Sequence, residues 1–282
     1  MQTIRIAGVP EHFNLPWHLA LEAGAFEDRK ISLEWTDVPE GSGRLAAMLA
    51  GGEVDLAVIL TEGLVKAAAD GLQAVILQEY IGSPLLWGIH VAADSRFENE
   101  KDLEGARAAI SRFGSGSHLM AYVNARRMSW DTEHLRFQLV DTLEGAIRNL
   151  QDGNADYFMW ERFTTQPLVD QGVFRRLGVC PTPWPCFIVA ARRDVADKKR
   201  AVLGEILATI NEYTMRFKEI PGIEKVLAQR YGQELEAIRE WLSLTQWSQG
   251  QISSQDLDST IETLSELNLL RNTITSGALL IK

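Results

Sequence analysis

Near the middle of the chain stands the sequence Ile110-Ser111-Arg112-Phe113-Gly114-Ser115-Gly116-Ser117-His118. It follows a short apolar run, residues 106–110, that is typical of a buried strand. It precedes the sequence Leu119-Met120-Ala121-Tyr122-Val123, which is typical of the opening of a helix. Glycine reaches positive φ without a Cβ clash, so a Gly-Ser-Gly-Ser connection can turn sharply. The sequence therefore predicts a strand, a tight loop and a helix at this point.

The same loop has the features of an anion-binding site. Backbone N–H groups and hydroxyls at a helix N-terminus favour a negative charge. The guanidinium of Arg112 can pair with a carboxylate, phosphate, phosphonate or sulfonate. The alternative is an ordinary flexible turn in which Ser117 is the N-cap of the helix. The loop lacks the Gly-Lys-Ser/Thr of a Walker loop and does not match the dinucleotide pattern G-x-G-x-x-G.

The composition limits the classes of function. The chain has 282 residues and a net charge of −10, which argues against a general binder of nucleic acid or anionic membranes. Cys180 and Cys186 lack a nearby pair of histidines, so we predict no metal site, and no motif calls for a cofactor. No apolar run is long enough to span a membrane, and no secretory signal is seen. We expect a cytoplasmic protein, or a periplasmic one if a signal was removed.

Outside the loop, predicted strands and helices alternate. Apolar runs such as Val54 to Leu60 are typical of strands covered on both faces, and they alternate with helical segments up to about residue 191. Among these elements are a predicted helix over residues 162–171 and a short strand over residues 174–177. From Val195 onward the pattern is almost entirely helical. We therefore predict an α/β protein with mixed, mostly parallel sheets and a helical C-terminal part. No flexible linker interrupts the chain, which indicates that it crosses between two lobes more than once.

Four short segments, taken in order, resemble the type 2 periplasmic-binding-protein fold. They resemble in particular the branch of nitrate-, taurine- and sulfonate-binding proteins and thiamine-pyrimidine synthases. The matching segments are Trp17 to Phe26, Gly52 to Ala57, Asp102 to Gly105 followed by the Gly-Ser-Gly-Ser loop, and Gly153 to Asp156 leading to Trp160-Glu161. The second and fourth are corresponding parts of the two lobes. The cysteine-rich motif of the pyrimidine synthases is absent from this sequence.

The resemblance implies two lobes that close on a ligand. Lobe one would comprise residues 1–88 and 190–282, lobe two residues 89–189, and the hinge would lie near residues 88–91 and 187–191. Ligands of this fold are held by loops after strands and by helix N-termini, where open α/β sheets place them. The implied ligand-binding residues are Glu11, His12, Phe13, Asn14, Thr61, Glu62, Arg112, Gly114, Ser115, Gly116, Ser117, His118, Trp160, Glu161 and Trp184.

Several of these side chains have alternative roles. Glu62 and Glu161 follow predicted strands and can do acid–base work, bind an amine of the ligand, or form salt links. His12 and His118 can make binding depend on pH near neutrality. Most tryptophans, Trp87 among them, are expected to be packing residues, whereas Trp160 and Trp184 are placed to cover an apolar part of the ligand.

The functional prediction is a solute-binding protein that clamps a small anionic or heteroaromatic molecule, with no cofactor and with a transporter or regulatory protein as its partner. The alternative is a cytoplasmic enzyme of thiamine-precursor or other cofactor metabolism that uses the same cleft. Fold alone does not decide between binding and catalysis. Identification of a released ligand, and of any product formed from it, separates the two.

Overall fold

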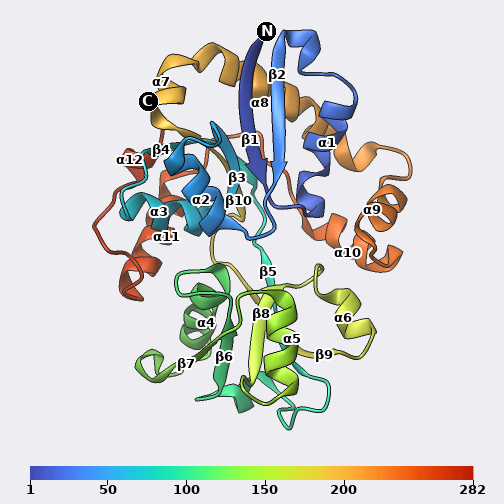
Figure 1. Cartoon of the computed structure of the whole chain (residues 1–282), viewed down its shortest axis with the longest axis vertical. Coiled ribbons are helices and arrows are strands. Elements are labelled where there is room, and N and C mark those ends of the chain that lie inside the picture. Colours follow the sequence, from blue (N-terminus) through green and yellow to red (C-terminus); the bar gives the residue numbers. More distant parts are fainter. Residues whose placement is uncertain (282) are drawn as a thin grey trace. The chain divides into compact units, whose positions relative to one another are not determined.

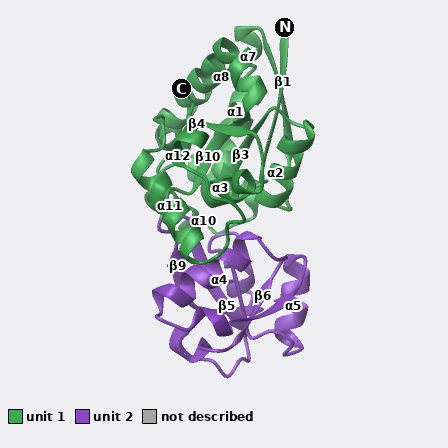
Figure 2. Cartoon of the chain, turned by 90° about the vertical axis from the view of Figure 1, so that its left-hand side faces the viewer, with its two compact units in different colours: residues 1–83, 184–282 green, residues 84–183 purple. Residues whose placement is uncertain are grey.

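The structure, a computed structural model, describes residues 1–281, which form two compact units (Figure 2). Unit 1 consists of residues 1–83 together with the chain from Trp184 onward, and unit 2 consists of residues 84–183. Both divisions lie a few residues before the predicted hinge segments. Those segments belong to strands β5 (Leu86–Ala92) and β10 (Phe187–Arg192), each of which lies within one unit.

Unit 1 is built on a five-stranded sheet whose strand order is β2-β1-β3-β10-β4. Strand β1 pairs in parallel with β2 and β3, whereas β10 is antiparallel to both of its neighbours, so β10 alone runs against the other four strands. The central strand β3 is an almost wholly buried run of apolar residues, as expected for a strand covered on both faces. The remaining strands are β1 (Gln2–Gly8), β2 (Ile31–Asp37), β3 (Leu56–Leu60) and β4 (Ala74–Ile81).

Helices from both ends of the chain surround this sheet (Figure 1). The N-terminal part supplies a 3-10 turn η1 (His12–Asn14) and the helices α1 (Leu15–Glu22), α2 (Ser42–Gly51) and α3 (Thr61–Ala69). The C-terminal part is helical, as predicted, and α8 packs against α1. Its helices are α7 (Arg193–Lys198), α8 (Arg200–Arg216), α9 (Ile223–Tyr231), α10 (Leu235–Leu244), α11 (Ser254–Glu266) and α12 (Ser276–Leu279).

Unit 2 repeats the same sheet plan with the strand order β7-β6-β8-β5-β9. Strands β7, β6 and β8 are parallel, and β5 is antiparallel to both β8 and β9. The α/β class with mixed sheets and mostly parallel strands is therefore confirmed. The elements are β6 (Arg107–Ile110), β7 (Arg136–Leu139), β8 (Tyr157–Glu161) and β9 (Phe174–Pro181), with helices α4 (Gly116–Arg127), α5 (Leu143–Gln151) and α6 (Gln166–Asp170).

An aspartate before the central strand of each sheet makes the same two contacts. In unit 1 the Asp55 carboxylate accepts the backbone N–H of Arg5 at 3.0 Å, and the Asp55 N–H donates to the Arg5 carbonyl at 2.8 Å. In unit 2 Asp156 and Arg107 exchange the equivalent bonds at 2.7 and 2.8 Å. The segments Gly52 to Ala57 and Gly153 to Asp156, which the sequence analysis compares as corresponding parts of the two lobes, thus occupy equivalent positions in the two sheets.

Three predicted element boundaries were wrong. Helix α4 begins at Gly116, earlier than predicted, and its N-cap is Ser115 instead of Ser117. The helix expected over residues 162–171 shortens to α6, because Pro167 has no N–H to donate and is tolerated only in the first turn. Strand β9 extends beyond the predicted residues 174–177 and reaches Pro181.

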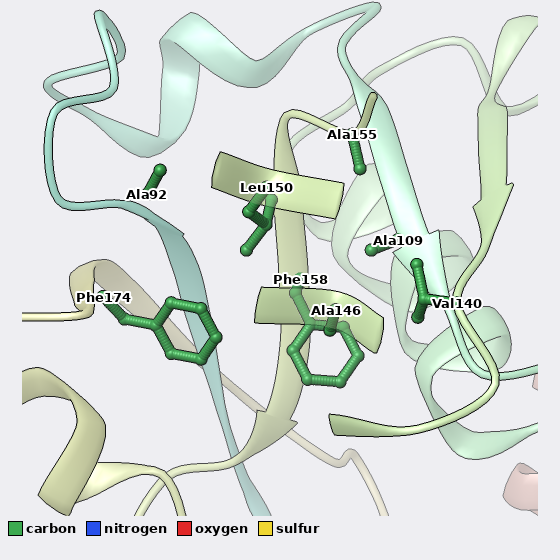
Figure 3. Packing of buried hydrophobic residues seen from close by; sticks show 8 residues of the cluster. All are labelled: Ala92, Ala109, Val140, Ala146, Leu150, Ala155, Phe158 and Phe174. Carbon is green, nitrogen blue, oxygen red and sulfur yellow. The ribbon is translucent and has the colours of Figure 1, made fainter. Parts of the chain in front are cut away.

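The core of unit 2 lies between helix α5 and the sheet. Phe158 of β8 and Phe174 of β9 fill its centre, and small residues let helix and strands approach (Figure 3). Trp160 of β8 packs against this cluster while remaining partly exposed. The buried members are Ala92, Ala109, Val140, Ala146, Leu150, Ala155, Phe158 and Phe174.

Both cysteines are buried free thiols, and burial raises the pKa of Cys180 to about 11. Within residues 1–281, no helix combines the length and apolar character needed to cross a membrane. The described residues also contain no group of three or more acidic, histidine or cysteine side chains placed to hold a metal ion.

Gly145 of α5 tests how closely this helix packs against the chain at Val140. A Cβ on Gly145 of α5 would lie 1.8 Å from the Val140 carbonyl oxygen, a backbone atom that cannot rotate away. We expect Gly145→Ala to destabilise the protein by about 3 kcal/mol, at the upper end of overpacking costs, in urea unfolding followed by circular dichroism.

The matched control is Gly204→Ala in α8, where nothing lies within 4 Å of the added Cβ. This substitution should raise stability by about 0.5–1 kcal/mol, because alanine favours the helix over glycine. Equal effects of the two substitutions would contradict the close contact between α5 and residue 140.

Candidate ligand-binding site

The loop after β6 folds into a tight turn that is closed before α4 begins. The Ser115 N–H donates to the Arg112 carbonyl at 3.1 Å, which places Phe113 and Gly114 at the tip of the turn. Gly114 has φ +81°, a conformation that favours glycine over residues with a side chain. Arg112 and Phe113 are exposed beside the turn, and Phe113 retains 65% of its surface.

The serine hydroxyls hold the loop together. Ser115 caps α4 by accepting the His118 N–H at 3.4 Å, and its hydroxyl lies 3.1 Å from that of Ser117. The Ser117 hydroxyl also accepts the Ser111 N–H at 3.1 Å, which ties the end of β6 to the first turn of α4. All three serines are buried. The loop is therefore a rigid hydrogen-bonded unit and not a flexible connection.

The first turn of α4 retains unused donors. The backbone N–H groups of Gly116 and Ser117 have no acceptor among residues 1–281, as is usual for the first positions of a helix. Their dipoles add to the positive end of the helix macrodipole. This part of the loop thus presents backbone donors where a negative group is favoured, with a guanidinium three residues before the N-cap.

His118 supports the loop from the helix. Its Nδ1 accepts the Gly114 N–H at 3.1 Å, so in the neutral ring the proton is on Nε2. Its ring makes edge-on contacts with Phe113, Tyr122 and Phe137 at centroid distances of 5.3, 5.2 and 4.8 Å. The side chain of His118 therefore positions the turn.

Trp87 of β5, expected from the sequence to be a packing residue, is buried against Gly116 of the loop, a contact that the sequence did not predict. A Cβ on Gly116 would lie 2.6 Å from Cη2 and 3.1 Å from Cζ2 of the Trp87 indole. The residue that opens α4 is therefore a glycine because an indole ring occupies the space of its side chain. Trp87 is 4% exposed, and its Nε1 has no hydrogen-bond partner within the described part of the chain.

Trp160 and Glu161, the last residues of β8, lie close to Trp87. Glu161 pairs directly with Trp87 across the two strands, and the Trp160 ring is edge-on to that of Trp87 at 6.5 Å. The Glu161 carboxylate accepts the N–H and the hydroxyl of Thr164 at 2.6 and 2.8 Å. Burial raises the pKa of Glu161. Glu161 therefore already has a structural partner in the turn that follows β8.

In unit 1 the predicted loop residues are largely inside the protein. His12 and Phe13 are buried against Trp241 of α10, with ring centroids at 4.2 and 5.2 Å. Asn14 donates from Nδ2 to the Val9 carbonyl at 2.8 Å, while Glu11 is partly exposed. His12 Nε2 and Asn14 Oδ1 have no hydrogen-bond partner within residues 1–281.

Burial lowers the pKa of His12 to about 3. Its imidazole is therefore neutral at physiological pH. This lowered pKa disfavours the predicted role of His12 in pH-dependent binding near neutrality, because the aromatic surroundings oppose the charged form.

Two hydrogen bonds within unit 1 join the start of α3, at Thr61 and Glu62, to the segment that begins at Trp184. The indole N–H of Trp184 donates to Glu62 Oε2 at 2.7 Å, and the Thr61 hydroxyl donates to the Pro185 carbonyl at 2.6 Å. The second carboxylate oxygen, Glu62 Oε1, is buried and has no partner among the described residues. Burial raises the pKa of Glu62 to about 7. These residues attach the segment that leads into β10 to the start of α3.

Comparisons with known proteins agree with this fold. The family model of Ca3427-like PBP matches residues 87–180, which is most of unit 2. No curated protein sequence matches the chain. The chain is similar to the solved Candida albicans CA3427 gene product, a protein with the generic periplasmic-binding-protein fold. The two share 26% identity with a TM-score of 0.88, over 97% of this chain and 92% of that one.

Two sulfonate-binding proteins are also similar in structure. The alkanesulfonate-binding protein SsuA from Xanthomonas axonopodis pv. citri, bound to MOPS, has 18% identity and a TM-score of 0.83, with 99% of this chain and 98% of that one covered. The aliphatic sulphonate binding protein SsuA from Escherichia coli has 20% identity and a TM-score of 0.79, with coverages of 99% and 97%. The predicted type 2 periplasmic-binding-protein fold is therefore confirmed.

The raised pKa of the buried Glu62 carboxyl predicts how the stability of the protein depends on pH. Its folded-state pKa of about 7 lies above the ordinary value of 4.5, so the folded protein holds this proton more tightly than the unfolded chain. Stability should therefore fall as the pH rises from about 4.5 to about 7, and then level off. Glu62→Gln removes this decline and should be more stable than the wild type by up to about 3 kcal/mol at pH 8, but not at pH 4.

Urea unfolding at a series of pH values checks this expectation. Glu53→Gln is the matched control, because Glu53 is a half-exposed surface glutamate paired with Arg44. Its stability curve should run parallel to that of the wild type. A Glu62→Gln curve that also runs parallel to the wild type would show that Glu62 ionises normally in the folded protein.

Proposed function

We propose that this chain, whose fold is that of the periplasmic binding proteins, is a solute-binding protein that holds a small anionic molecule on unit 2. The anionic group would bind at the N-terminus of α4, between the backbone N–H groups of Gly116 and Ser117 and the guanidinium of Arg112. The observation that carries the proposal is the rigid loop itself. Its serines and His118 satisfy one another, so they fix the loop and leave the two backbone donors available.

The proposed ligand is an oxyanion attached to a carbon skeleton. Sulfonate, phosphonate and carboxylate oxygens all accept hydrogen bonds from backbone N–H groups and from guanidinium. Two structurally similar proteins bind sulfonates, one of them with MOPS in its structure, which supports a sulfonate as the first probe. The exposed ring of Phe113 beside the loop is available for contact with the carbon skeleton.

On unit 1, the loop of residues 11–14 stays a proposed ligand contact. His12 Nε2 and Asn14 Oδ1 are buried polar atoms without a protein partner within residues 1–281. Phe13, Thr61, Glu62 and Trp184, by contrast, already pack or bond within unit 1, which favours a supporting role.

An enzyme of thiamine-precursor or other cofactor metabolism is less well supported than a binding protein. The two carboxyl groups considered for acid–base work, Glu62 and Glu161, each accept a hydrogen bond from a neighbouring side chain. The experiment that separates the two functions is native mass spectrometry of gently purified protein, followed by incubation with any ligand that is released. Recovery of the unchanged ligand supports binding, and conversion to a product supports catalysis.

The predicted cytoplasmic location and the predicted transporter or regulatory partner belong to the same proposal. Cell fractionation, with a cytoplasmic and a periplasmic marker protein alongside, tests the compartment. Co-purification after crosslinking in cells tests the partner.

Arg112 gives the direct test of the anion site. We expect Arg112→Ala to weaken binding of MOPS at least about tenfold in isothermal titration calorimetry, since a charge-assisted hydrogen bond is lost. The matched control is Arg126→Ala, which removes an exposed arginine from the last turn of the same helix and should leave the affinity unchanged. Equal effects of the two substitutions would mean that only the overall charge matters, and binding that survives both would place the anion elsewhere.

A further inference from the structure

Unit 2 begins and ends with a proline. The chain enters this unit at Pro84 and leaves it at Pro183, and these are the two places where it crosses between the units. Both prolines are exposed, whereas the residues that follow them, Leu85 and Trp184, are buried. A proline has no N–H to donate, and its ring fixes φ at about −65°. Each crossing is therefore a single surface residue with one free backbone angle of its own.

Hydrogen bonds hold the chain on the unit 2 side of both crossings. The Leu85 N–H donates to the Thr182 hydroxyl at 3.0 Å, and the Thr182 N–H donates to the Leu85 carbonyl at 2.9 Å. Both residues are buried. The two ends of unit 2 are thus bonded to each other immediately next to the prolines.

The chain is also held on the unit 1 side of both crossings. The Cys186 N–H donates to the Ser83 carbonyl at 3.2 Å, which joins the two crossings within unit 1. The Thr61 N–H at the start of α3 donates to the Cys186 carbonyl at 3.0 Å. The indole N–H of Trp184 donates to the Glu62 carboxyl of the same helix at 2.7 Å. The second crossing is therefore attached to α3 through both its backbone and a side chain.

Few backbone angles remain free between these two sets of bonds. A residue that precedes a proline is restricted to extended conformations, which limits ψ of Ser83 and of Thr182. Trp184 also precedes a proline and is restricted in the same way. The ψ angle of each crossing proline remains. Because the two crossings are bonded to each other on both sides of the prolines, rotation at one of them requires rotation at the other.

We propose that Pro84 and Pro183 form a two-point hinge that confines movement between the two units to one narrow path. This hinge lies before the segments expected from the sequence, residues 88–91 and 187–191, which belong to the hydrogen-bonded strands β5 and β10. The inference concerns the connection between the units and does not depend on the proposed anion site. With such a hinge, a ligand that contacts both units costs less conformational freedom on binding than with a flexible connection.

Distances between spin labels on the two units test the proposal in the full chain. The labels are attached at Asp152→Cys in unit 2 and at Asp197→Cys in unit 1, both exposed positions, whereas Cys180 and Cys186 are buried. Double electron–electron resonance then gives the distribution of label distances without any ligand. We expect one narrow distribution when both crossing prolines are present.

Pro84→Ala combined with Pro183→Ala should broaden this distribution. Alanine frees φ at each crossing, which lowers the weight of any one arrangement by about two- to fivefold for each substitution. Either substitution alone should broaden the distribution less, because the other crossing still limits the rotation. Circular dichroism and urea unfolding check that the variants are folded, and the two single variants decide the question if the double variant is not.

Pro181→Ala is the matched control. Pro181 is an exposed proline two residues before Pro183, but it is the last residue of β9 and lies within unit 2. Its substitution should leave the distribution unchanged. A broad distribution with all prolines present would overturn the proposal. So would crossing variants that stay as narrow as the original chain, or a Pro181→Ala variant that broadens as much as they do.

Discussion

The sheets of both units depend on an aspartate that fixes how two parallel strands are paired. Parallel strands cannot be joined by a tight turn, so their relative register has to be set by contacts made away from the connection. Asp55 and Asp156 do this by exchanging two backbone bonds with Arg5 and Arg107, at the beginning of the central strand. A slip of one residue would turn every side chain of β3 or β8 to the other face.

This register also determines where the loops of the proposed site begin. Once β1 is aligned with β3, and β6 with β8, the ends of these strands lie along one edge of each sheet, and the connections to α1 and α4 leave from that edge. The two connections correspond in the fold but differ in chemistry. In unit 1 the sequence His12-Phe13-Asn14 packs its rings into an aromatic cluster with Trp241. In unit 2 the loop residues are small, and the serine hydroxyls bond to one another and to the first turn of α4.

Much of this arrangement was predictable from the sequence because it depends on local patterns. Apolar runs bounded by glycines predicted the strands, and the repeated Gly-x-x-Asp segments indicated two lobes of one design. The loop of residues 111–118 was recognisable because glycine and serine are the residues that a capped helix start requires. The N-cap was misplaced by two positions, since Ser115 and Ser117 satisfy the same preference and only the turn at Gly114 distinguishes them.

The part that could not be predicted consists of contacts between distant segments. Nothing in the residues around Trp87 indicates that its indole takes the place of a side chain at Gly116, because that contact exists only after β5 and α4 have been packed together. The glycine was the available signal, since a glycine at the first position of a helix invites the question of what lies against it. Glu62 is similar, because its role follows from Trp184, which is far along the chain and becomes its neighbour only in the folded unit.

The overall negative charge of the chain bears on how such a loop can select an anion. A net charge of −10 repels anions, but salt screens that repulsion at separations beyond about 10 Å. In the proposed site the backbone N–H groups of Gly116 and Ser117 act only at contact distance, and they cost little to keep in place because the loop is already held by hydrogen bonds. The charge of a guanidinium, in contrast, acts over a longer range, which salt shortens. In the proposed site the neutral backbone donors should therefore set the selectivity for an oxyanion, while Arg112 would add affinity that weakens as salt is raised.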